Sequence, residues 1–245
     1  MIFRYLFRRT NFARQRRHAL TLRRLRMESL ERRNLLATFL VTTTIDENDV
    51  APAVGAGLSL REAIGLANAN ADADTITFDP VAFAGSQTID LSAVFGQLQI
   101  SNTLTITGPG ADRLKIDAQG NSRVMQFSGL SGNLSLSGLT IVGGKTTATE
   151  TFGGGGIRFD SSGTLSLTRS SLSGNSAAGT RASGGGIFAS SGALTLTGST
   201  LSGNSTAGYG GGIFAGNVAV TLTSSTLSGN GAAGMAAASM QAVAL

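Results

Sequence analysis

Several residue types that support cross-linking, catalysis or metal binding are absent or nearly absent from this sequence. Its 245 residues include no Cys, no Trp, one His and three Pro. Without Cys there is neither a disulfide framework nor a thiolate metal site. The single His, His18, lies in an Arg-rich N-terminal segment. The rest of the chain therefore has no Ser-His-Asp triad and no His metal ligand, and we expect no metal and no cofactor.

Long hydrophobic runs and evenly spread charge are also missing. No apolar run approaches the roughly 20 residues that a membrane helix needs, and residues 1–37 lack the apolar core of a secretory signal. Residues 1–33 contain eleven Arg and two Glu, a net charge of +9, whereas the remainder has a net charge of −4. The body is therefore mildly acidic, and we do not expect it to bind nucleic acid.

The Arg-rich segment supports several hypotheses. It is a basic, loosely helical or disordered arm, a targeting segment, or an arm that touches anionic lipid or nucleic acid. A nucleic-acid role would show as a strongly salt-dependent affinity that is lost on deletion of residues 1–37.

What the sequence does contain is Gly, Ser, Thr and Leu in an internal repeat. A strand pattern Leu-x-Leu/Ile begins at five positions, with steps of 30, 31, 29 and 26 residues: Leu104, Leu134, Leu165, Leu194 and Val220. A second strand recurs at Ile141, Leu172, Leu201 and Leu227, and a third, GGGI, at Ile157, Ile187 and Ile213. LKID at Leu114 and VMQF at Val124 fill the second and third positions earlier in the chain.

Short, nearly identical strands at this spacing stack on their own copies in successive repeats. The sequence therefore predicts an all-β, right-handed parallel β-helix of about five to six rungs, with three parallel sheets. Leu194 and Leu196 should point inward and Thr195 and Thr197 outward. Asn175, Asn204 and Asn230 end the LSGN motifs, and we expect them to form a ladder of side-chain amide hydrogen bonds at one corner.

One amphipathic helix precedes the repeats and is expected to cap the solenoid. Ser59 and Glu62 form a capping-box pattern, and Leu60, Ala63, Ile64 and Ala67 make one apolar face. We divide the chain into an Arg-rich leader or sorting segment (1–37), an N-terminal strand and capping helix (38–79), the repeats (80–230) and an Ala-rich tail (231–245). The last rung looks unfinished, so the tail is either a small cap or a sign of truncation, and we expect end-to-end self-association.

Three motifs resemble known bacterial proteins. SLREAIGLANANA, followed by DTITF, resembles the "SLREAI" segment of secreted parallel β-helix proteins, in which a Cys often stands at the position of Leu58. MESLERRNLLA, Met27–Ala37, resembles the LEPR-XLL N-terminal motif of large surface proteins, with a second Arg and an Asn where that motif has Pro-Arg-X. The GGGI and LSGN motifs of residues 134–230 resemble repeats of polymorphic outer-membrane proteins.

These resemblances imply export and a surface-exposed, pectate-lyase-like β-helix used in adhesion. We therefore expect a non-catalytic structural or adhesive protein at the extracellular or outer-membrane surface, with surface glycans or other cell-surface proteins as partners. The alternative is a carbohydrate-active protein related to polysaccharide lyases or glycoside hydrolases, either active or degenerate. Such enzymes need clustered carboxylates.

The best cluster for that alternative is GADRLKID, with Asp112, Arg113, Lys115 and Asp117; Asp160 would join it if the rungs align. The alternative is that these residues are charged side chains of a surface turn with no catalytic role. VGGKT, residues 142–146, lacks the first Gly of a phosphate-binding loop. No catalytic, cofactor-binding or metal-binding residue is predicted.

Overall fold

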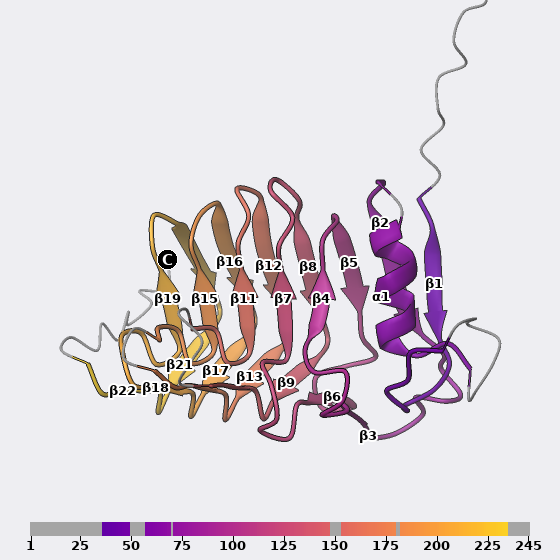
Figure 1. The fold of residues 1–245 in the computed structure, drawn as a ribbon, viewed down its shortest axis with the longest axis horizontal. Helices are drawn as coiled ribbons and strands as arrows, with labels where there is room; N and C mark the ends of the chain where they lie inside the picture. Colours follow the sequence, from indigo (N-terminus) through magenta and orange to yellow (C-terminus); the bar gives the residue numbers. More distant parts are fainter. Residues whose placement is uncertain (1–35, 50–56, 70, 148–152, 180–181, 235–245) are drawn as a thin grey trace, which may run out of the picture. The chain divides into compact units, whose positions relative to one another are not determined.

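The computed structural model describes residues 36–49, 57–69, 71–147, 153–179 and 182–234. They belong to a unit that begins at Asn34 and fold as a parallel β-solenoid of about five turns with one helix (Figure 1). The predicted leader, the LEPR-like motif before Leu36 and the tail beyond residue 234 lie outside the described residues.

Two wide sheets form much of the solenoid wall. The first contains seven strands in the order β1 (Thr38–Val41), β2 (Asp74–Phe78), β5 (Leu104–Thr107), β8 (Leu134–Ser137), β12 (Thr164–Thr168), β16 (Ala193–Thr197) and β20 (Ala219–Thr223). The second contains six strands: β3 (Gln87–Asp90), β6 (Leu114–Asp117), β9 (Thr140–Val142), β13 (Ser171–Ser173), β17 (Thr200–Ser202) and β21 (Thr226–Ser228).

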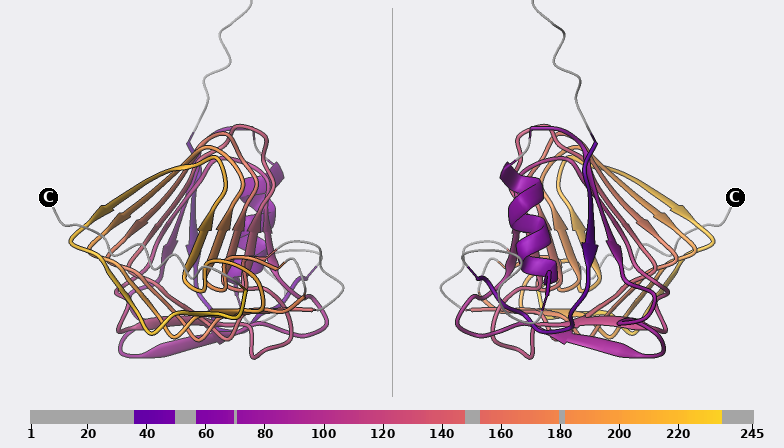
Figure 2. Two further views of the ribbon diagram at one scale, coloured as in Figure 1. Left: turned by 90° about the vertical axis from the view of Figure 1, so that its left-hand side faces the viewer. Right: turned by 90° about the vertical axis from the view of Figure 1, so that its right-hand side faces the viewer.

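Two further sheets complete the coil, as the end-on views show (Figure 2). One has five strands: β4 (Leu98–Ile100), β7 (Met125–Phe127), β11 (Ile157–Phe159), β15 (Ile187–Ala189) and β19 (Ile213–Ala215). The other has four two-residue strands: β10 (Lys145–Thr146), β14 (Ser176–Ala177), β18 (Ser205–Thr206) and β22 (Gly231–Ala232).

The strand registers are those that the repeat predicts. Leu165 pairs with Leu134 and Leu194, Leu201 with Leu172 and Leu227, and Ile187 with Ile157 and Ile213. The LKID and VMQF segments also occupy the second and third positions, because β6 pairs with β9 and β7 with β11.

Two expectations need correction. The described residues form four sheets rather than three, because a two-residue strand follows the Asn corner in each later coil. Strands of two residues carry no alternation of apolar and polar side chains, so no sequence pattern marks them. The strands of the first coil were also not identified individually within the predicted repeat region 80–230: β3 and β4 pair with β6 and β7, whereas QTID and LQI share little sequence with later repeats.

The core is built from stacked inward side chains. Leu194 and Leu196 are fully buried, whereas Thr197 is exposed and Thr195 partly so. Phe127 and Phe159 lie one above the other with their ring centroids 5.2 Å apart, and Ala189 follows in the same column. Burying a large apolar side chain contributes about 1.5–3 kcal/mol, so these columns are the main source of stability.

The predicted Asn ladder is confirmed. The Asn175 amide nitrogen Nδ2 donates to Asn204 Oδ1 at 3.0 Å, and Asn204 Nδ2 donates to Asn230 Oδ1 at 2.9 Å. Each Oδ1 also accepts a backbone N–H from the preceding rung, from Gly144, Asn175 and Asn204 in turn. Gly144 therefore takes the ladder position in the coil before Asn175.

The predicted helix, α1 (Leu60–Ala69), closes the N-terminal end of the solenoid (Figure 1). Its capping box forms as expected: Ser59 N donates to Glu62 Oε2 at 2.9 Å, and Glu62 N donates to Ser59 Oγ at 3.1 Å. The predicted apolar face is buried, and α1 packs against β1, β2 and β4. In the described part of the chain, no helix has the length and apolar character needed to span a membrane.

Candidate binding face on the five-stranded sheet

The outward surfaces of the two wide sheets are mostly Ser and Thr. In the seven-stranded sheet one outward column runs Thr75, Thr105, Ser135, Ser166, Thr195, Thr221. Identical hydroxyl side chains tolerate stacking at the rung spacing of roughly 4.8 Å, where like charges would repel. The seven-stranded face therefore carries little chemical variety.

The five-stranded sheet differs. Its outward column runs Gln99, Gln126, Arg158, Phe188, Phe214, one residue per coil. The third-strand motif reads GGGIRF at Arg158 and GGGIFA in the next two coils. The outward side chain at this repeat position therefore changes from Arg to Phe.

Hydrogen bonds connect the polar side chains on this face. Gln97 Nε2 donates to Gln126 Oε1 at 2.8 Å and to Gln99 Oε1 at 3.1 Å. Gln99 Nε2 in turn donates to Ser128 Oγ at 2.8 Å. We call the connected set the polar strip; its members are Gln97, Gln99, Gln126, Ser128, Arg158, Asp160 and Ser190.

The strip continues into an ion pair. Arg158 Nε lies 2.6 Å from Asp160 Oδ2, and both side chains are about three-quarters buried, at 21% and 25% exposure. Gln126 Nε2 and Ser190 Oγ approach the same carboxylate at 3.4 Å. Asp160 is therefore held from three coils at once.

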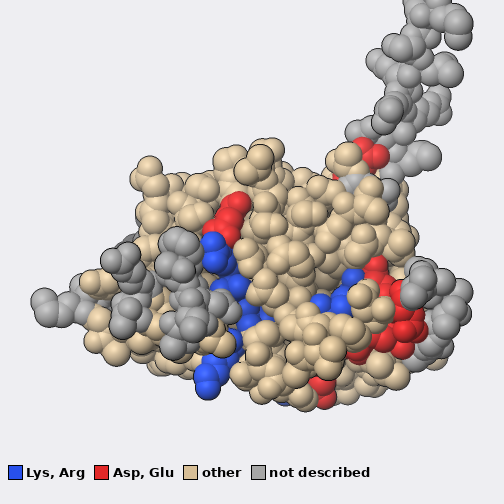
Figure 3. All heavy atoms as spheres, viewed as in Figure 1, with Lys and Arg blue, Asp and Glu red and all other residues tan. Residues whose placement is uncertain are grey.

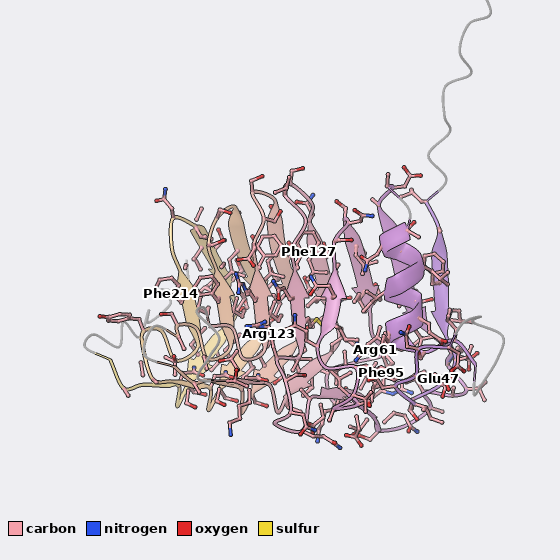
Figure 4. All side chains as sticks on the ribbon, in the orientation of Figure 1. Glu47, Arg61, Phe95, Arg123, Phe127 and Phe214 are labelled. Atoms are coloured by element: carbon pink, nitrogen blue, oxygen red, sulfur yellow. The ribbon has the colours of Figure 1, made fainter. Side chains whose placement is uncertain are left out.

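A buried cation lies beneath the strip. Arg123 is 2% exposed, and its side chain is labelled on the face shown in Figure 4. Its guanidinium donates to the carbonyl oxygens of Gly153 and Gly154 and, at 2.7 Å, to Gln97 Oε1. Arg123 thus fixes the amide orientation of Gln97 and the turn before β11.

Aromatic side chains follow the strip toward the C-terminal coils. The Phe188 and Phe214 rings stack with their centroids 5.3 Å apart and an interplanar angle of 7°. The Arg158 guanidinium lies 5.9 Å from the Phe188 ring centroid, within cation–π range. Phe188 is 7% exposed and Phe214 is partly exposed.

Charge is divided along the solenoid. On the face shown in Figure 3, acidic side chains gather at the end that carries α1, and a stripe of Lys and Arg crosses the middle coils. Residues 34–120 contain ten Asp and Glu against three Lys and Arg, whereas only two acidic residues follow them.

The predicted acidic cluster is not assembled as one site. Lys115 and Asp117 lie on β6 of the six-stranded sheet, with Asp112 and Arg113 in the turn before it, whereas Asp160 follows β11 of the five-stranded sheet. Asp117 Oδ1 accepts the Gln119 backbone N–H at 2.7 Å, where Gln119 has a φ of +53°. The expectation that Asp160 joins this cluster was wrong, because the two segments belong to different sheets.

One pair of carboxylates does come together. Asp90 and Asp117 are register partners on β3 and β6, and both point outward because Ile89 and Ile116 are buried. Lys115 lies two residues away on the same face. Among the described residues, no group of three or more His, Cys, Asp and Glu is arranged to hold a metal ion.

Sequence reasoning singled out Asp160 but missed the Gln side chains and the two stacked Phe rings. The available signal was the position two residues after the last Gly of GGGI, where Arg158, Phe188 and Phe214 replace the Ser and Thr of other outward positions.

Comparison with known proteins adds no relative: no family model, no curated protein and no solved structure matches the chain. The strand topology places the protein in the class of parallel β-solenoids.

Proposed function

We propose that this chain is a non-catalytic β-solenoid of the bacterial extracellular or outer-membrane surface, with a structural or adhesive role. The observation that carries the proposal is the contrast between faces: the seven-stranded sheet presents a column of Ser and Thr, whereas the five-stranded sheet carries the polar strip. A rigid rod with one elaborated face suits contact with a partner better than turnover of a substrate.

The motif resemblances support the same conclusion. The SLREAI segment is typical of secreted parallel β-helix proteins, the LEPR-XLL-like motif of exported surface proteins, and the GGGI and LSGN motifs of polymorphic outer-membrane proteins. These residues also have clear structural roles here, since Ser59 and Glu62 cap α1 and Asn204 extends the ladder. Partners of this function are surface glycans or other cell-surface proteins.

Cell fractionation combined with surface proteolysis tests the proposal. We expect the full chain in the surface or culture-medium fraction of the source bacterium, degraded by protease added to intact cells. A cytoplasmic enzyme of the same cells is the control, and it should resist the protease. Recovery of the chain in the cytosol, protected from protease, would contradict the proposal.

The alternative is carbohydrate cleavage, which the outward pair Asp90 and Asp117 favours. Glycoside hydrolases need paired carboxylates, and polysaccharide lyases need clustered acids with calcium and a basic residue; Lys115 lies on the same face as the pair. If the chain degrades any polysaccharide, Asp117→Asn should abolish that activity while Asp160→Asn leaves it intact. Activity that survives Asp117→Asn would exclude this pair.

A further inference from the structure

We propose that the polar strip binds an uncharged polysaccharide laid along the solenoid axis. The inference rests on the proposed surface function and names its ligand. The strip crosses the first four strands of the five-stranded sheet, from Gln99 on β4 through Gln126 and Arg158 to Ser190 after β15. It therefore runs across coils, along the solenoid axis.

The chemistry of the strip suits sugar hydroxyls. Its side chains include three primary amides, a guanidinium and a carboxylate, each of which presents two polar atoms in one plane. Neighbouring hydroxyls of a pyranose ring offer a matching pair of donors and acceptors. Exposed Gln99, Ser128 and Ser190 are the members most open to solvent.

The strip is ordered by its own hydrogen bonds. Gln97 is held by Arg123, Gln99 by Ser128, and Asp160 by Arg158. Side chains that are already oriented lose little conformational freedom when a ligand binds. A polar face of this kind can bind hydroxyls without the entropy loss that long, mobile side chains would incur.

The charge balance of the strip favours an uncharged polymer. Arg158 is paired with Asp160, so the charges of the strip's own members balance, and the adjoining Arg123, which donates to Gln97 and Gln126, is only 2% exposed. An anionic polymer would meet the Asp160 carboxylate. A protein partner is favoured less, because the polar strip has no Trp or Tyr, the side chains that with Arg dominate protein-binding hot spots.

The spacing also fits an extended polysaccharide. Successive coils are roughly 4.8 Å apart, and one pyranose ring advances an extended chain by a comparable length, so successive rings can face successive coils. Next to the strip, the partly exposed Phe214 offers an apolar surface against which the C–H face of a sugar can pack.

Affinity electrophoresis of the purified full chain tests the inference. The gels contain soluble β-glucan, arabinoxylan or mannan as uncharged polymers and polygalacturonate as the anionic counterpart. We expect at least one uncharged polymer to retard the chain, with retardation that changes little when salt is raised. Gln99→Ala and Asp160→Asn should each weaken this binding about tenfold, as expected for loss of one or two hydrogen bonds.

Thr197→Ala is the matched control, because it removes an exposed outward hydroxyl from the seven-stranded sheet. Circular dichroism and thermal melting check that each variant folds; Gln99→Ala lies at an exposed position and keeps the test valid if Asp160→Asn does not fold. Binding to no uncharged polymer, binding unaffected by Gln99→Ala, or salt-sensitive binding to polygalacturonate alone would each overturn the inference. A surface location without such binding would leave the proposed function standing, whereas a cytosolic location contradicts that function whatever the gels show.

Discussion

At the scale of single residues, the Asn ladder shows how one side chain satisfies several buried backbone groups. Asn204 is fully buried. Its Oδ1 accepts from both the backbone N–H and the side-chain amide of Asn175, and its Nδ2 donates to the Leu172 carbonyl at 3.0 Å. An unpaired buried polar group is costly, so this corner depends on an amide at each rung.

Asn204→Ala should therefore lower the free energy of unfolding by about 3 kcal/mol, because it removes the acceptor of the Asn175 backbone N–H, one of the two acceptors of Asn175 Nδ2, and the side-chain donor to the Leu172 carbonyl. Urea denaturation followed by circular dichroism measures the change. Ser202→Ala, at a partly exposed outward position on β17, is the control and should change the unfolding free energy by less than about 0.5 kcal/mol. Equal effects of the two substitutions would show that the Asn ladder does not contribute to the free energy of unfolding.

At the scale of elements, α1 completes the first coils as well as covering their core. Asn68 donates to the Gln99 carbonyl at 2.8 Å and accepts the Ser101 backbone N–H at 2.9 Å, and so satisfies backbone groups of β4 and the following residue. Arg61 binds Asp46 through two hydrogen bonds of 2.8 Å and reaches the Gly96 carbonyl at 2.7 Å. Figure 4 shows Arg61 beside Phe95 near the base of the helix.

Arg61→Lys should loosen this end of the solenoid, because an ammonium cannot reproduce the two-pronged contact with Asp46. We expect faster hydrogen exchange in residues 43–49 and 92–97 and a loss of about 2 kcal/mol of local stability, since the pair is largely buried. Arg113→Lys is the control, because Arg113 is exposed and its guanidinium donates to the Phe83 carbonyl with a long bond of 3.3 Å rather than to a carboxylate pair. Unchanged exchange in both segments of Arg61→Lys would contradict this role.

At the scale of the whole solenoid, its two ends differ. α1 covers the first coils, whereas β19, β20, β21 and β22 are each the last strand of their sheets among the described residues. Core positions in this last described coil are only partly buried, as at Ile213, Val220, Leu222 and Leu227. Unpaired strand edges next to apolar side chains promote association.

We therefore expect the purified chain to associate end to end, with a mean mass that rises with concentration in light scattering. Leu222→Lys should reduce this association, because an inward-pointing charge at a sheet edge opposes pairing. Thr195→Lys adds the same charge to an outward position on β16, a strand that is paired on both sides, with β12 and β20, and should leave association unchanged. A monodisperse monomer of the unsubstituted chain at all concentrations would refute the prediction.

Much of this fold could be predicted from the sequence because a solenoid repeats its local rules. The positions of Leu194, Leu201 and Ile187 determined which strands stack, and the Ser59–Glu62 spacing determined where the helix begins. The individual strands of the first coil and the two-residue strands could not be predicted, because they pair with strands of adjacent coils rather than through a pattern in their own sequence. The polar strip was also missed, because its members lie from residue 97 to residue 190.

By itself, the sequence determined a parallel β-solenoid, its registers, its inward columns and its Asn ladder, since each follows from similar residues that recur every 26–31 residues. It also determined the helical cap, through the Ser59–Glu62 capping box and one apolar face. Only the tertiary structure decided which outward residues share a face. It brought Gln97, Gln126 and Asp160 together and placed Asp117 on another sheet. The physical reason is that the corners between strands set the direction of each sheet, and corner geometry depends on backbone hydrogen bonds between coils rather than on any local pattern.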